Sequence, residues 1–142
     1  MRSARNQVIT TLAAFTALVT VAVGLWAIVD PESFYAIIAP YPPYSQHLIH
    51  DIGAFVLGLG CCLVLGLFVR DALLVVLAGN AIGGTAHFIS HVIDRSLGGH
   101  ANDPGAIGLV ALLLTLLSVA RWWAVRASQT VATHRVIQGV SK

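Results

Sequence analysis

The sequence predicts an all-α, polytopic membrane protein, a four-transmembrane-helix up-and-down bundle with a short interfacial helix after the first span. Of its 142 residues, 57% are hydrophobic and 10% are charged, and the mean hydropathy is +0.83. Because soluble domains carry roughly 25% charged residues, these side chains need lipid as their solvent. Four apolar segments reach the length of about 20 residues that a membrane-crossing helix requires. The chain length suits a single domain.

The four spans are predicted at residues 8–29, 47–69, 72–94 and 104–125, followed by a cytoplasmic tail at 127–142. The first apolar stretch is longer than the roughly 7–15 residues of a signal peptide, so we expect it to be retained as a helix. Arg70 and Asp71 alone join the second and third spans. Such a short link predicts an antiparallel hairpin.

The first connection, DPESFYAIIAPYPPYSQ, predicts a short helix at the membrane surface. Asp30 can cap its N-terminus, and Pro31 suits its first position. Three tyrosines suit the headgroup level; they are Tyr35, Tyr41 and Tyr44. The third connection, RSLGGHAND, is polar and glycine-rich.

The positive charges predict the orientation of the chain. Seven of the eight Lys and Arg residues fall on one side of the predicted spans: Arg2, Arg5, Arg70, Arg121, Arg126, Arg135 and Lys142. Only Arg95 falls on the other side. Since Lys and Arg are enriched in cytoplasmic segments, we expect both termini in the cytoplasm and the first and third connections outside it. The net charge of +2 gives no reason to expect nucleic-acid binding.

Glycines predict close helix contacts. The third span contains Gly79-x-x-x-Gly83 followed by Gly84, a pattern that lets a neighbouring helix approach closely. The second span carries further glycines for which we expect the same role: Gly53, Gly58, Gly60 and Gly66. Cys61 and Cys62 are adjacent in an apolar run, which favours small membrane-core residues over a disulfide or a zinc site.

The stretch TAHFISHVID places two imidazoles and a carboxylate at the end of the third span. At about 100° per residue, His87, His91 and Asp94 fall within a helical arc of about 60°. Ionisable residues inside a membrane are costly and usually face the bundle interior or a wet cavity. This face is therefore a candidate functional site.

The second span opens with HLIHD, which supplies His47, His50 and Asp51. An up-and-down topology puts this segment on the same side of the membrane as the end of the third span. Together the two segments predict a transition-metal site, because imidazole suits iron, copper and zinc alike. We expect His50, His87 and His91 to bind the metal, with Asp51 and Asp94 completing or orienting the site and His47 as a further candidate. The expected role is that of a redox accessory, with enzymatic activity left open.

Four alternatives remain open from these residues. A b-type haem could lie between His50 and either His87 or His91, with Gly83 and Gly84 making room for it. The polar residues could also form a structural hydrogen-bonded network, or they could handle protons for a bound quinone. Finally, the glycine-rich faces fit a non-enzymatic membrane subunit, whose polar cluster docks a larger complex or a lipid headgroup, or a homo-oligomer.

Several segments resemble the DoxX-like family of small four-helix bacterial membrane proteins, including its relatives of unknown function. They are GLWAIVDP at the end of the first span, GAFVLGLG in the second and the hairpin FVRDALLV. The resemblance covers roughly residues 10–120. It implies a bacterial inner-membrane location and, in some members, quinone-linked sulfur oxidation or oxidative-stress complexes. It assigns no functional residue to the His and Asp cluster.

Overall fold

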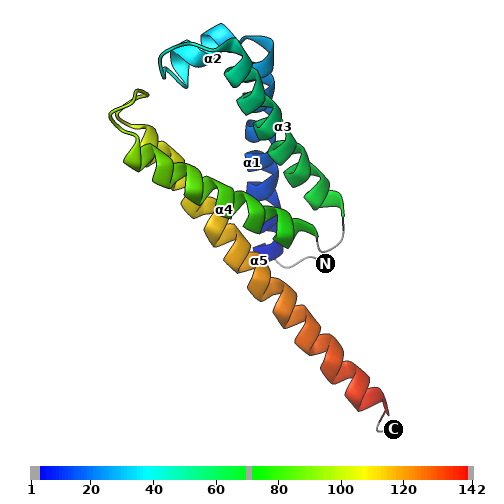
Figure 1. The fold of residues 1–142 in the computed structure, drawn as a ribbon. Coiled ribbons are helices and arrows are strands. Elements are labelled where there is room, and N and C mark those ends of the chain that lie inside the picture. Colours follow the sequence, from blue (N-terminus) through cyan, green and yellow to red (C-terminus); the bar gives the residue numbers. More distant parts are fainter. Residues whose placement is uncertain (1–3, 70–71, 141–142) are drawn as a thin grey trace.

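The computed structural model describes residues 4–69 and 72–140, with side chains described up to residue 130, and every regular element in these ranges is a helix (Figure 1). The helices are α1 (Ala4–Val29), α2 (Pro31–Ile37), α3 (Gln46–Phe68), α4 (Ala72–Ile93) and α5 (Asp103–Val140). Four are long and apolar enough to cross a membrane, over Ala4–Val29, Gln46–Phe68, Ala72–Ile93 and Asp103–Thr130. The predicted all-α, four-span membrane architecture is confirmed.

The observed helices extend beyond two of the predicted spans. The first begins at Ala4, and the last continues to Val140 through most of the segment expected to be a tail. No glycine or proline occurs between Gly108 and Gly139, so nothing in that sequence interrupts the helix. The predicted link at Arg70 and Asp71 lies outside the described residues.

The interfacial helix α2 forms as its sequence predicts. Asp30 is the N-cap and accepts a hydrogen bond from the backbone N–H of Ser33 at 3.2 Å, and Pro31 occupies the first helical position. Hydrogen bonding from the Ser33 side chain, and then from its backbone N–H, lowers the pKa of Asp30 below its usual value. The indole N–H of Trp26 in α1 donates to the Ser33 hydroxyl at 2.7 Å, which fixes α2 against the end of α1.

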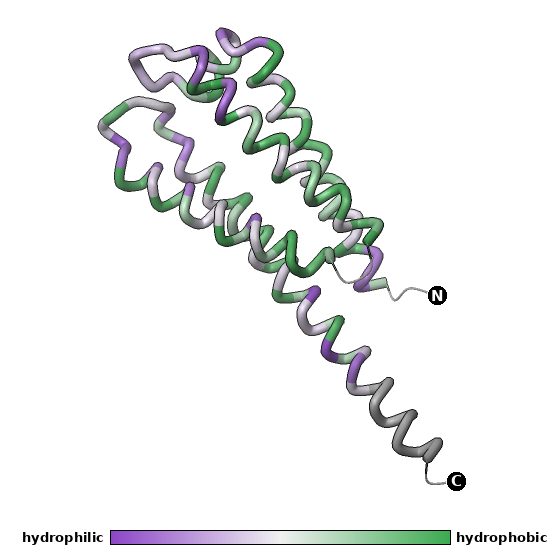
Figure 2. The backbone as a smooth tube through the Cα atoms, turned by 45° about the vertical axis from the view of Figure 1, so that its right-hand side comes forward, coloured by the Kyte–Doolittle hydropathy of each residue, from purple (hydrophilic) through white to green (hydrophobic). Residues whose placement is uncertain are grey.

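The bundle has two ends of different character. The link end holds the start of α1, the end of α3 and the start of α4, whereas the loop end holds α2 and the loops at 38–45 and 94–102 (Figures 1 and 2). All four spans meet in one core toward the link end, where Leu63 of α3 and Leu77 of α4 are fully buried. At the loop end, a smaller cluster of Ala27, Phe34 and Ile49 seats α2 on α1 and α3.

The helices pack mainly as two pairs, α1 with α3 and α4 with α5. The α3 and α4 helices approach near the link end and run apart toward the loop end (Figures 1 and 2). Large apolar side chains point away from the protein, including Phe55 of α3 at 77% exposure and Leu109 of α5 at 69%. This exposure is what lipid as the surrounding solvent requires.

The closest helix contact joins α1 and α3 through glycines. A Cβ on Gly60 of α3 would lie 2.7 Å from the backbone nitrogen of Val21, and one on Gly24 of α1 would lie 2.5 Å from that of Leu57. Real Cβ atoms do not come this close to a backbone, so both positions require glycine for the observed approach. The expected role of Gly60 is confirmed.

The expectation for the Gly79-x-x-x-Gly83 pattern is wrong for this chain. A Cβ on Gly79 or Gly83 would meet no atom of the described residues within 4 Å, and the same holds for Gly58. Gly83 lies about 20° around α4 from Val76, the residue that would meet a Cβ on Gly66 of α3. Gly83 therefore sits on the side of α4 from which α3 has already diverged.

We predict that Gly60→Ala destabilises the protein by about 1–3 kcal/mol, because the added methyl group forces the α1 and α3 backbones apart. Thermal unfolding in detergent measures the effect. Gly58→Ala is the matched control on the same helix, where the methyl group meets open space. Equal unfolding temperatures for the two variants would contradict the α1–α3 contact.

Candidate functional site

Two imidazoles meet near the loop end of α4. His87 and His91 lie one helical turn apart, and their Nε2 atoms are 2.9 Å from each other, with ring centroids separated by 4.6 Å. The spacing of four residues puts both side chains on one face of the helix. Each ring therefore directs its outer nitrogen to a common point.

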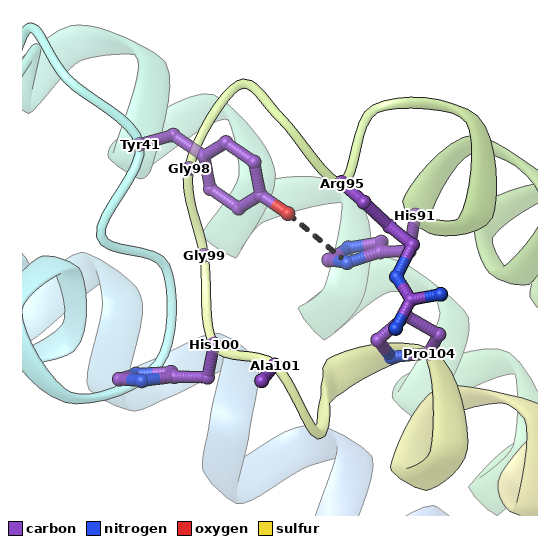
Figure 3. A pocket seen from close by; sticks show the side chains of 8 residues that line it. All are labelled: Tyr41, His91, Arg95, Gly98, Gly99, His100, Ala101 and Pro104. Carbon is purple, nitrogen blue, oxygen red and sulfur yellow. Dashed lines mark hydrogen bonds between the residues drawn. The ribbon is translucent and has the colours of Figure 1, made fainter.

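A third residue joins the pair from a distant part of the chain. The hydroxyl of Tyr41, in the loop between α2 and α3, lies 3.1 Å from Nδ1 of His91, and the two rings meet edge to face at 86° (Figure 3). This hydrogen bond fixes the rotation of the His91 ring and leaves its Nε2 facing His87. Tyr41, His91 and His87 thus form one continuous hydrogen-bonded chain.

The Tyr41 loop is held in place by the loop that follows α4. The backbone N–H of Gly99 donates to the carbonyl of Pro40 at 3.2 Å, and Nε2 of His100 lies 3.0 Å from the carbonyl oxygen of Ile37. Gly99 has a φ of +79°, and a Cβ there would lie 2.5 Å from the Tyr41 hydroxyl oxygen. A glycine is therefore needed both for the backbone conformation and for the fit beneath Tyr41.

The electrostatic surroundings keep Tyr41 in its neutral form. Its pKa is raised above the usual value, first by burial and then by the negative charges of Asp103 and Asp94. A neutral phenol can both donate and accept a hydrogen bond. Tyr41 is therefore able to pair with His91 in either tautomer of that imidazole.

A small polar pocket adjoins the hydrogen-bonded chain. It has a volume of about 260 Å³ and is lined by Tyr41, His91, Arg95, Gly98, Gly99, His100, Ala101 and Pro104. Figure 3 shows Tyr41 reaching His91 from one side while the Arg95 side chain passes His91 on the other, toward Pro104. The pocket therefore combines residues from the two loops with the end of α4.

The predicted ligands on the second span occupy a different place. His47 pairs with Asp51 on α3, with 3.5 Å between Nε2 and Oδ2, and the His47 side chain is 89% exposed. His50 lies about 160° around α3 from Gly66, the position that meets α4. No hydrogen bond or ion pair of the described residues joins His50 to His87 or His91.

The six predicted metal residues therefore do not converge as one set. Over residues 4–69 and 72–140, no group of three or more His, Cys, Asp or Glu side chains is arranged to hold a metal ion. Among the described residues, His87 and His91 are the only two predicted metal ligands whose ring nitrogens contact each other. Asp94 follows α4 directly, three residues after His91. Of the two glycines expected to make room for a haem, a Cβ on Gly83 would meet no described atom within 4 Å, and one on Gly84 would meet Ala111 of α5 at 3.6 Å, an ordinary contact.

Sequence reasoning placed Tyr41 only as a membrane-surface anchor and missed its contact with His91. The available signal was its position between Pro40 and Pro42, since prolines restrict the backbone and fix a loop side chain in one direction. The role of Gly99 was missed as well. Its partner, Tyr41, is more than fifty residues away in the sequence.

Comparison with protein-family models, with curated proteins and with solved structures finds no match for this chain.

We predict that Gly99→Ala destabilises the loop end by about 1–2 kcal/mol or more, because an alanine at positive φ is strained and its methyl group would displace Tyr41. Thermal unfolding in detergent measures the loss. Gly105→Ala is the matched control, since a Cβ at Gly105 meets nothing within 4 Å in the described structure. If the two variants unfold alike, the loop contact does not hold Tyr41 in place.

Proposed function

We propose that this membrane protein binds one transition-metal ion through Nε2 of His87 and Nε2 of His91 and acts as a redox accessory. The separation of 2.9 Å between these atoms carries the proposal. Metal–imidazole bonds are about 2.0–2.1 Å long, so two of them meeting at about 90° place their nitrogens about 2.9 Å apart. A single ion can therefore accept both rings with little movement of either.

The hydrogen bond between Tyr41 and His91 supports the same proposal. Histidines that bind a metal usually donate their other ring N–H to an oxygen, which fixes the tautomer and the ring orientation. The Tyr41 hydroxyl lies 3.1 Å from Nδ1 of His91 and can accept such a bond. Asp94 is the proposed third ligand after a change of its side-chain rotamer, with water or a redox partner in the remaining positions. His47, His50 and Asp51 stand outside this smaller set.

The ligand chemistry leaves iron, copper and zinc as candidates, of which iron and copper suit a redox role. In a variant of this proposal, His87 or His91 binds the iron of a haem in place of a bare metal ion. The bacterial inner membrane as location, the cytoplasmic termini, the membership in the DoxX-like family and the docking to a larger complex also remain predictions from the sequence.

We predict that gently purified protein contains about one iron, copper or zinc per chain and that His87→Ala/His91→Ala abolishes it, because both proposed nitrogen ligands are removed. Elemental analysis by mass spectrometry measures the content, and an absorbance scan separates haem from a bare ion. His47→Ala/His50→Ala is the matched control and is expected to keep the metal. Metal retained in the first variant, or lost equally in both, would refute the proposed ligands.

A second candidate function rests on the chain of three titratable groups from Tyr41 through His91 to His87, with hydrogen bonds of 3.1 and 2.9 Å. Such a chain can pass protons between the pocket and the interior of the bundle, as a bound quinone would require. In this alternative the pocket holds the quinone ring, and Tyr41 and His91 hydrogen-bond its oxygens.

The Tyr41→Phe variant separates the two functions, because it removes the hydroxyl and keeps both imidazoles. If a quinone binds, the variant weakens the affinity for a short-tailed benzoquinone by about two- to tenfold, the effect of one neutral hydrogen bond. Calorimetry in detergent measures that affinity, and elemental analysis follows the metal in the same samples. An unchanged quinone affinity would eliminate this second candidate.

A further inference from the structure

We infer that the pocket lined by Tyr41, His91 and Arg95 binds the phosphate group of an anionic phospholipid in the membrane leaflet at the loop end. This inference stands apart from the proposed metal, because its central residue is Arg95 and its ligand is part of the membrane. It gives a function to Arg95, the single positively charged side chain that the sequence places on this side of the spans.

The guanidinium of Arg95 is available for such a ligand. It makes no ion pair or side-chain hydrogen bond within the described residues, and the side chain is exposed while lining the pocket. Figure 3 shows the Arg95 side chain running past His91 toward Pro104, at one side of the pocket. Five N–H donors in a planar fork match two phosphate oxygens, a geometry that favours Arg at phosphate sites.

The rest of the pocket suits an anion as well. The Tyr41 hydroxyl lines the same pocket as Arg95, and it can donate to an anion when Nδ1 of His91 carries its proton. No carboxylate is among the lining residues; the negative charges of Asp103 and Asp94 act on Tyr41 from outside that lining, so Arg95 supplies the attraction for an anion. The carboxylate of Asp103 accepts the backbone N–H of His100 at 2.7 Å, so one of its oxygens is already occupied.

The size and depth of the pocket favour a headgroup. Its volume of about 260 Å³ falls below the roughly 300–1,000 Å³ of pockets that enclose a whole small-molecule ligand. Arg95 follows the last residue of α4, Ile93, by two positions, so it lies where that span leaves the apolar layer. Lys and Arg at such positions attract anionic lipids.

Neighbouring apolar side chains distinguish a lipid from a free phosphate ion. Ile93 is 73% exposed and Leu97 is 63% exposed, one on each side of Arg95 in the sequence. Both can contact acyl chains while the phosphate lies on Arg95. Inorganic phosphate would use the guanidinium alone and gain nothing from these two side chains.

The test is native mass spectrometry of the full chain in detergent, titrated with phosphatidylglycerol, with phosphatidylcholine and with phosphatidylglycerol in excess inorganic phosphate. We expect one tightly bound phosphatidylglycerol per chain and about tenfold weaker binding in Arg95→Gln, the loss of a charge-assisted hydrogen bond. Arg126→Gln removes the same charge from α5, where Arg126 stacks on Trp122 at 4.3 Å. This control is expected to bind phosphatidylglycerol as the wild type does.

Four results would overturn the inference. Equal phosphatidylglycerol binding by the wild type and Arg95→Gln would remove Arg95 from the site, and an equal loss in Arg126→Gln would reduce the effect to net charge. Equal binding of phosphatidylcholine would refute the preference for an anionic lipid. Displacement of the lipid by inorganic phosphate would make the free ion the ligand. Because lipid is counted directly, each result is independent of whether a metal is present.

Discussion

The contact between the two loops at the loop end is the constraint on which the candidate site depends. The N–H of Gly99 donates to the Pro40 carbonyl, and Tyr41 covers Gly99 so closely that no side chain fits there. Toward this end α3 and α4 run apart, so the loops join the two helix pairs where the spans no longer touch (Figure 1). Without this contact Tyr41 would not reach His91, and the polar pocket would lose one wall.

Two kinds of polar side chain within the spans find their hydrogen-bond partners in different ways. Several hydroxyl groups donate to the backbone carbonyl four residues earlier on their own helix, at 2.8–2.9 Å: those of Thr16, Thr20, Thr85, Thr115 and Ser118. Because these hydroxyl groups are satisfied within one helix, they cost little free energy in lipid. His87 and His91 behave differently, because their ring nitrogens bond to each other and to Tyr41. An intramembrane polar set held by tertiary contacts is the kind that marks a functional site in membrane proteins.

Sequence patterns predicted correctly those features that depend on interactions between residues close together in the chain. The four spans follow from runs of apolar residues, and α2 follows from Asp30 and Pro31, which act within one helical turn. The pairing of His87 with His91 follows from helical periodicity alone. The glycine patterns were less informative, because Gly60 and Gly79 look alike in sequence while only Gly60 meets a neighbouring backbone. Periodicity says which residues share a face, but it does not say what that face meets.

The sequence by itself determined the number of spans, the interfacial helix and the His87–His91 pair, since each depends on composition or on residues within a few positions of one another. The tertiary structure decided which distant groups join that pair. It placed Tyr41 on His91 and Arg95 beside it, whereas His47 pairs with Asp51 on its own helix, α3. The physical reason is that helix crossing and loop docking depend on side-chain packing summed over many residues. Two segments on the same side of the membrane can therefore face each other or face apart with the same local sequence.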